Sequence, residues 1–232
     1  MKLIKYAAAA LLALSSLSAS AALISIVDSG SVEYAPNIAT PDNNNFTYAG
    51  IISPSQYTIA GSLKANAKLK VTYYYLGKEA NWTNLFAVPG SAEAPLGGSS
   101  GASINKGTIT TIVEKDSLFD FLFYSPLKGA EYAVTNAEGA TLLSNNRYYS
   151  FAALLNGSYT GTGPNGTLAH AGNYDAILFL DDTAGFLDGV PDDDNHDDLI
   201  IGVRVTAVPE PTTLLLMSMG LLGLFGARRL KS

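Results

Sequence analysis

Residues 67–76 read Ala-Lys-Leu-Lys-Val-Thr-Tyr-Tyr-Tyr-Leu, so that apolar and polar side chains alternate along most of the stretch. Successive side chains of an extended backbone point to opposite sides, and this alternation therefore predicts a β-strand with one buried face. The two sets are Leu69, Val71, Tyr73 and Tyr75 on the buried face and Lys68, Lys70, Thr72 and Tyr74 on the other.

Nine more β-rich runs accompany this strand, separated by turn-forming Gly, Pro and Asn residues. They are residues 23–27, 46–52, 57–60, 85–88, 107–113, 118–124, 148–155, 174–180 and 199–206. Residues 91–106 and 156–172 are expected to be the long loops. The pattern predicts an all-β body, an antiparallel β-sandwich or a jelly roll.

The composition limits the possible functions. The chain has 232 residues, of which 47% are hydrophobic and 15% charged, enough for one domain with a buried core. Cysteine is absent, which excludes disulfides, thiolate catalysis and Cys-ligated metals. A net charge of −6 argues against nucleic-acid binding, which requires clustered Lys and Arg to contact phosphates.

The first residues have the layout of a secretory signal peptide: Lys2 and Lys5, then an apolar run, then small residues. Ala19 and Ala21 supply the small side chains that signal peptidase requires before the cleaved bond. We therefore predict export through the Sec translocon and removal of residues 1–21.

The other end combines Pro209-Glu210-Pro211, an uncharged segment at 212–227 and the basic pair Arg228-Arg229. As a helix this segment would span about 24 Å, and it can cross a core of about 30 Å if the arginines extend toward the headgroups and the bilayer thins locally. Apolar side chains cover every face, which predicts a transmembrane helix. The positive-inside rule places the basic pair in the cytoplasm.

This order and spacing over residues 208–232 resemble the PEP-CTERM sorting signal of Gram-negative bacteria. The resemblance implies that exosortase, a membrane transpeptidase, recognises Pro209-Glu210-Pro211 as a substrate motif and removes the tail. The body would then reach the cell envelope or the extracellular polysaccharide, typically in bacteria that make exopolysaccharide or grow as biofilms. The predicted division is a signal peptide at 1–21, a β-sandwich domain at 22–207 and a sorting signal at 208–232.

Residues 175–198 hold nine carboxylates and neither Lys nor Arg, between two apolar runs that we expect to pair antiparallel. Crowded carboxylates repel one another unless a cation or water screens them. Oxygen ligands without thiols favour Ca²⁺, although no register of the loop fits an EF-hand. The candidate ligands are Asp181, Asp182, Asp192, Asp194, Asn195, Asp197 and Asp198.

Two alternatives to Ca²⁺ stay open, a solvated acidic loop that keeps the exported body soluble and another metal ion. Removing both ends takes away five basic residues and one acidic residue, which lowers the net charge from −6 to −10. If an ion does bind, strand alternation from Leu199 onward puts Asp197 on the more apolar face and Asp198 on the other. We therefore expect Asp197, with Asp182 on the facing strand end, to matter most.

A second resemblance concerns the body. Residues 192–203, Asp-Asp-Asp-Asn-His-Asp-Asp-Leu-Ile-Ile-Gly-Val, and 76–86, Leu-Gly-Lys-Glu-Ala-Asn-Trp-Thr-Asn-Leu-Phe, are similar to a body type of many PEP-CTERM proteins and related bacterial surface β-sandwich modules. In these the acidic run opens the last strand and the Gly-Lys-Glu-Ala run follows a central one. Trp82 departs from the pattern, where a smaller side chain or Tyr is common. The family has no settled activity, so the resemblance implies fold and surface location only.

Two further groups of residues could take part in binding. Glu79, Asn81 and Asn84 could join the acidic loop across the sheet end, although turn formation is the simpler explanation. Six aromatic residues could stack on sugar rings, but alternation buries about half of them: Tyr73, Tyr74, Tyr75, Trp82, Tyr148 and Tyr149.

We expect a non-enzymatic protein. Neither His170 nor His196 has a serine nearby in a plausible nucleophile arrangement, and consecutive Asp residues in one loop suit cation ligation better than glycoside hydrolysis. The first hypothesis is an exosortase substrate whose Ca²⁺-stabilised sandwich associates with exopolysaccharide. An extracellular carbohydrate-binding module is the alternative, and a secreted polysaccharide hydrolase the third.

Overall fold

The computed structural model describes residues 22–27, 32–34, 50–52, 56–59, 61–99, 104–144, 148–184 and 196–209, together with Met219. The predicted signal peptide lies outside the described residues, and so does the predicted membrane span except for Met219.

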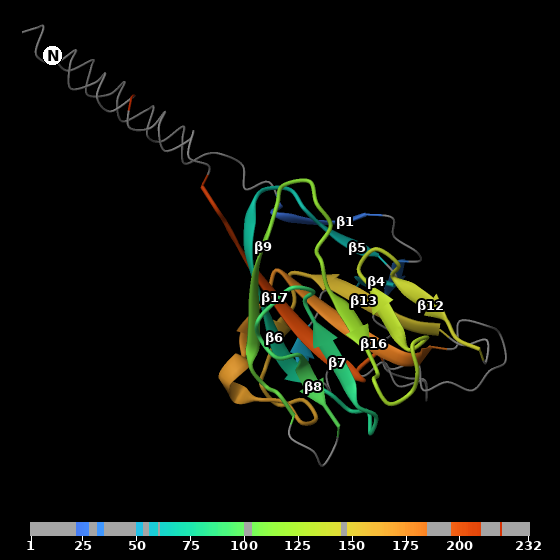
Figure 1. Ribbon diagram of the computed structural model, residues 1–232. Coiled ribbons are helices and arrows are strands. Elements are labelled where there is room, and N and C mark those ends of the chain that lie inside the picture. The colour runs from blue at the N-terminus through green and yellow to red at the C-terminus, as the bar shows by residue number, and fades with distance from the viewer. Residues whose placement is uncertain are drawn as a thin grey trace, which may run out of the picture.

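The elements are extended strands and one turn of 3₁₀ helix (Figure 1). In chain order they are β1 (Ile24–Val27), β2 (Val32–Tyr34), β3 (Ile51–Ile52), β4 (Gln56–Ile59), β5 (Ser62–Ala65), β6 (Leu69–Gly77), β7 (Asn84–Ala87), β8 (Leu96–Gly98), β9 (Thr108–Val113), β10 (Leu122–Tyr124), β11 (Ala133–Thr135), β12 (Ala140–Leu142), β13 (Tyr148–Leu155), β14 (Ser158–Tyr159), η1 (Leu168–His170), β15 (Gly172–Asn173), β16 (Ala176–Ala184) and β17 (Leu199–Ala207).

The largest sheet has the strand order β2-β4-β13-β16-β17-β6-β9, with β12 also paired to β13. A second sheet has the order β11-β10-β7-β8, and two smaller ones are β1-β5 and β15-β14-β3. The strand pairs of these sheets are antiparallel. The prediction of an all-β antiparallel body is confirmed.

The two larger sheets face each other across one hydrophobic core, as in a β-sandwich. The predicted alternation of β6 holds, because its apolar residues from Leu69 to Tyr75 are buried in this core and Lys70 is exposed. Aromatic rings connect the sheets: the ring centroids of Tyr73 and Phe86 are 4.9 Å apart. Tilted and edge-on pairs of this kind add to the stability that burial provides.

The central strands of the largest sheet are buried on both faces. Ile177 and Phe179 of β16 point away from the main core and pack with Tyr159 and Tyr174 in a second apolar cluster. The small sheet β15-β14-β3 contributes to this cluster and covers that face. Burial on both faces explains why the runs at β16 and β17 are almost continuously apolar.

The two expected loops are partly wrong. Residues 91–106 include β8, which pairs with β7 and is buried. Gly97 has a φ of +95°, and a Cβ there would lie 2.4 Å from the Asn84 carbonyl oxygen, so glycine is what allows this close approach. Residues 156–172 include β14 and η1. Tyr159 of β14 is buried in the second apolar cluster, which fixes this segment against the sheet.

Candidate functional sites at the two ends of strand β17

Strands β16 and β17 form the hairpin at whose end the acidic residues lie. They pair antiparallel up to Leu180 and Leu199, and the Asp198 N–H donates to the Leu180 carbonyl at 3.2 Å. This register brings Asp181 and Asp182 beside the residues that precede Leu199. The predicted pairing of the two apolar runs is confirmed.

Four of the predicted ligand carboxylates gather at this sheet end. Asp181, Asp182 and Asp197 are buried, with 1%, 5% and 3% of their surface exposed, and Asp198 is half-buried. The Asp198 Oδ2 accepts from the Asp182 N–H at 2.6 Å, and the Asp182 Oδ2 accepts from the Asn84 Nδ2 at 2.7 Å. Asp181, Asp182 and Asp197 belong to the protein interior, so the alternative of a solvated acidic loop does not describe these three residues.

Lys78, directly after β6, supplies a positive charge to this region. Its side chain is fully buried, and its Nζ donates to the Gly98 carbonyl at 2.7 Å and to the Trp82 carbonyl. Burial lowers the pKa of Lys78, while the nearby Asp198 and Asp182 carboxylates act in the opposite direction. The sequence predicts a cation from solution at this end and gives no such role to Lys78, whose only signal is its place at the end of an apolar strand.

Histidine and tyrosine side chains complete the cluster. The His196 Nδ1 lies 3.7 Å from the Asp181 Oδ2, and both side chains are buried. His196 has a φ of +30°, an uncommon conformation for a residue with a side chain. Tyr149 is fully buried, and burial together with the charges of Asp182 and Asp198 raises its pKa well above the usual value.

The structure describes only some of the predicted Ca²⁺ ligands. Within the described part of the chain, no group of three or more His, Asp or Glu side chains is arranged to hold a metal ion. Asp192, Asp194 and Asn195 lie outside the described residues. The ligand set therefore stays a prediction.

The segment after β6 does reach the acidic end. Asn84 donates from its side-chain amide nitrogen to the Asp182 carboxylate. The Glu79 backbone N–H donates to the Asp197 carbonyl at 3.0 Å. The described part of the acidic run, from residue 196 onward, thus lies beside the run 76–86 in the fold.

The six candidate sugar-stacking residues divide as the alternation predicts. Tyr73, Tyr75 and Tyr149 are buried, and Tyr74, Trp82 and Tyr148 are half-buried. The Lys128 Nζ lies 3.4 Å from the centroid of the Trp82 ring, so a cation covers one face of that ring.

The other end of β17 leads out of the body. The Val208 N–H donates to the Lys68 carbonyl at 2.8 Å, and Pro209 directly after it is exposed. In Figure 1 this segment leaves the sheets at the upper left of the view. Glu210, Pro211, Arg228 and Arg229 lie outside the described residues.

Residues 207–229 match the family model described as the PEP-CTERM protein-sorting motif. The chain carries a PEP-CTERM sorting signal. Proteins with this signal are exported and sorted to the cell surface by exosortase, so the chain is an exosortase substrate with a β-rich body. The resemblance seen in the sequence at Pro209-Glu210-Pro211 and Arg228-Arg229 is confirmed.

No curated protein and no solved structure is significantly similar to this PEP-CTERM chain. The resemblance of the body to other surface modules therefore stays a prediction. Among the described residues, no helix is both long enough and apolar enough to cross a membrane.

Proposed function

We propose that this chain is a non-enzymatic surface protein that associates with the exopolysaccharide or biofilm matrix of a Gram-negative cell. Residues 212–227 would hold the exported chain in the inner membrane until exosortase acts at Pro209-Glu210-Pro211. The observation that carries the sorting part of the proposal is that Pro209 is exposed two residues after the end of β17. A motif that begins where the folded body ends is accessible to a membrane enzyme without unfolding of the sandwich.

Changing the motif tests the proposal. Glu210→Ala removes the acidic residue of the recognised motif, and replacing both Arg228 and Arg229 by Glu removes the charges that fix the orientation of the tail. We expect both variants to accumulate as uncleaved protein in the membrane fraction, as detected by immunoblotting of cell fractions.

Glu93→Ala is the matched control, because Glu93 is an exposed glutamate of the β-rich body, outside the sorting signal, and its carboxylate accepts from Ser91. It should be processed normally. Normal mature protein from the Glu210→Ala variant and from the double arginine variant would end the sorting proposal.

Ca²⁺ stabilisation is a separate part of the proposal. Its support is the gathering of Asp181, Asp182, Asp197 and Asp198 at one sheet end, next to the loop that carries the other candidate ligands. The buried Lys78 is a competing explanation for the same negative charge. The two explanations differ in whether added Ca²⁺ raises the stability of the protein.

Carbohydrate binding is the second candidate function. The observation that favours it is Tyr74, which stays half-buried on the outer face of β6 beside Arg204. A secreted polysaccharide hydrolase is the third, and turnover of polysaccharide by the purified protein would establish it in place of the non-enzymatic function.

A further inference from the structure

Strands β9, β6 and β17 present one outer face that carries positive charge. On each strand alternate residues enter the main core, and the intervening ones point outward. Cross-strand register places Arg204 beside Thr72 and Thr72 beside Thr110. We call these outward residues the cationic face: Lys70, Thr72, Tyr74, Thr108, Thr110, Ile112, Arg204 and Thr206.

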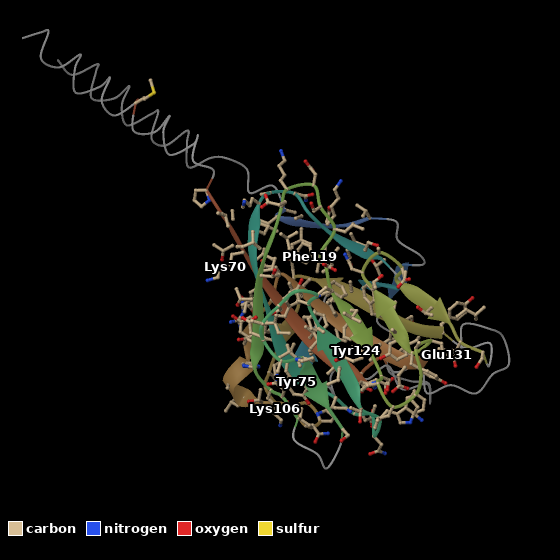
Figure 2. The ribbon with its side chains drawn as sticks, in the orientation of Figure 1. Lys70, Tyr75, Lys106, Phe119, Tyr124 and Glu131 are labelled. Atoms are coloured by element: carbon tan, nitrogen blue, oxygen red, sulfur yellow. The ribbon has the colours of Figure 1, made fainter. Side chains whose placement is uncertain are left out.

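The sign of this face is unusual for the molecule. The body without its two ends has a net charge of −10, yet none of the residues in these three strands is acidic. Lys70 is exposed, and Figure 2 shows it at the left edge of the molecule. Arg204 is half-buried and forms no ion pair with any described carboxylate. Two carboxylates from outside these strands border the face: the Asp175 Oδ2 accepts from the Val205 N–H at 2.8 Å, and Glu93 lies beside the Thr110 backbone. Among the described residues neither forms an ion pair with Lys70 or Arg204, so both cations can pair with an anionic ligand.

Arg204 is held in place by its neighbours. Its Cζ lies 4.8 Å from the Tyr74 ring centroid and 4.4 Å from that of Tyr174. Its Nε donates to the Asn173 carbonyl at 2.9 Å. A Cβ at Gly172 would lie 2.8 Å from an Arg204 Nη, so the glycine leaves room for the guanidinium. A guanidinium fixed in this way loses little freedom when it pairs with a carboxylate through two parallel hydrogen bonds.

The remaining side chains suit a polyhydroxylated ligand. Thr72 and Thr110 share a hydrogen bond between their hydroxyls, 3.3 Å apart, and Thr108 and Thr206 are exposed. Hydroxyls both donate and accept hydrogen bonds, as sugar hydroxyls do. Lys70 faces Thr206 in the register, which places it two positions along the strands from Arg204, or about 7 Å.

We propose that the cationic face binds a carboxylated polysaccharide, with Arg204 pairing with one uronate carboxylate, Lys70 with another, and the threonine hydroxyls with the sugar hydroxyls. This rests on the proposed association with exopolysaccharide and names the chemical class of the polymer. An anionic membrane surface is the competing ligand. Binding to such a surface typically relies on clusters of about 4–8 basic residues, whereas this face has two basic residues.

Binding of the full-length protein in mild detergent to polygalacturonate, with neutral dextran in parallel, tests the proposal by calorimetry. We expect binding to polygalacturonate only, weakening as salt increases. Arg204→Gln should weaken it by at least about tenfold, because charge-assisted hydrogen bonds are lost. Arg204→Lys should stay weaker than wild type, since lysine lacks the planar fork.

Lys64→Gln is the matched control, because Lys64 is a partly exposed lysine on β5, in the separate β1-β5 sheet. It should bind like wild type. Lys70→Gln, at an exposed position, reports on the face even if Arg204→Gln fails to fold, and it too should weaken binding. Equal affinity of Lys70→Gln, Arg204→Gln and Lys64→Gln, equal binding to dextran, or Arg204-dependent binding only to phosphatidylglycerol vesicles would overturn the proposal.

Failure of the polysaccharide-binding proposal can be distinguished from failure of the sorting proposal. Arg204→Gln leaves the PEP-CTERM signal intact, so it should be processed like wild type in cell fractions. A protein that is sorted normally but does not bind polygalacturonate contradicts the polymer assignment alone. A protein that binds polygalacturonate although Glu210→Ala is processed normally contradicts sorting alone.

Discussion

Lys78 places an ammonium group where solvent does not reach. Two carbonyl oxygens accept from it, and the charges of Asp182 and Asp198 favour its charged form against the effect of burial. Removing one member of a buried polar cluster leaves the others without compensation, which destabilises far more than loss of a surface pair. Lys78 thus places a cation of the protein itself beside two of the carboxylates that are also candidate Ca²⁺ ligands.

Lys78→Met should lower the free energy of unfolding by about 2–4 kcal/mol near neutral pH, because the Trp82 and Gly98 carbonyls lose their donor and two carboxylates lose a nearby positive charge. Urea unfolding measures this difference. Lys115→Met, at an exposed turn position, should stay within about 0.5 kcal/mol of wild type. Equal stability of the two variants would show that the buried lysine contributes nothing.

The stability difference between Lys78→Met and the wild-type protein should depend on pH, and the direction follows from the pKa of Lys78. Burial lowers the pKa of Lys78 in the folded protein, so above that pKa the unfolded chain binds more protons. Stability from this residue therefore rises with pH until the unfolded value of about 10.4. The deficit of Lys78→Met should widen between about pH 7 and about pH 10, and a deficit that narrows would mean a raised pKa.

Tyr73 and Tyr75 form a natural comparison on β6, since both are fully buried. The Tyr75 hydroxyl donates to the Asn165 carbonyl at 3.1 Å, whereas no described group bonds the Tyr73 hydroxyl. Tyr75→Phe should therefore cost about 1 kcal/mol, and Tyr73→Phe should leave stability unchanged or raise it. Thermal and urea unfolding of the pair measure this, and a larger loss in Tyr73→Phe would reverse the assignment.

What the sequence could predict at this scale is local. Alternation placed Leu69 and Tyr73 in the core, because period two is a property of any extended chain. The hydrogen-bond partners of the carboxylates could not be predicted from the sequence. Asn84 and Asp182 are 98 positions apart in the chain, and only the order of the strands in the sheets brings them together. The PEP-CTERM signal was recognisable because its parts are consecutive in the chain.

At the scale of elements, the long strands and the four-residue strands β1, β4 and β7 were predicted to within one residue or a few, but several of the shortest strands were not. Strand β13 was predicted with its observed bounds, because eight residues give a clear apolar run. The strands β8, β11 and β12 have three residues each, which is too short for an alternation of apolar and polar residues to be recognised. The sequence around β8 is also rich in turn-forming residues, which predicted a loop there.

The β16–β17 hairpin decides the Ca²⁺ proposal. Bound Ca²⁺ at 100 times its dissociation constant should add about 2.7 kcal/mol to the stability of the folded state. Asp197, 3% exposed at the start of the strand, needs partners to remain charged, so Asp197→Ala and Asp182→Ala should abolish the increment. Asp193→Ala, at the middle of the loop, should reduce it only slightly. Melting each variant with Ca²⁺ and with chelator measures the increment.

Two results would count against this proposal. Equal melting temperatures of the wild-type protein with Ca²⁺ and with chelator would leave Lys78 as the explanation for the buried charge. An Asp193→Ala variant that loses as much as Asp197→Ala would place ligation throughout the loop instead of at the strand end.

The whole molecule is a layered structure in which the largest sheet is covered on both faces at its central strands and on one face elsewhere. The main core lies between the large sheets, and the second cluster lies beneath the β15-β14-β3 sheet. Tyrosines take part in both, and several of them carry hydroxyls into apolar surroundings. Ionisation of such a group requires a charge in a low-dielectric interior, which links folding to alkaline pH.

Burial raises the pKa of Tyr73, Tyr75 and Tyr149, and that of Tyr174 to about 12. Each raised pKa means that the folded protein holds a proton that the unfolded chain releases near pH 10, so the stability is complete below about pH 10 and is lost as pH rises through the folded values. We expect the protein to unfold cooperatively above about pH 10, with tyrosinate absorbance from the buried rings rising together with the loss of far-ultraviolet circular dichroism. Tyr73→Phe should shift this transition to higher pH, because one linked proton is removed. Full ionisation of the tyrosines while the circular dichroism is unchanged would show that these rings are open to solvent and that the core is not packed as described.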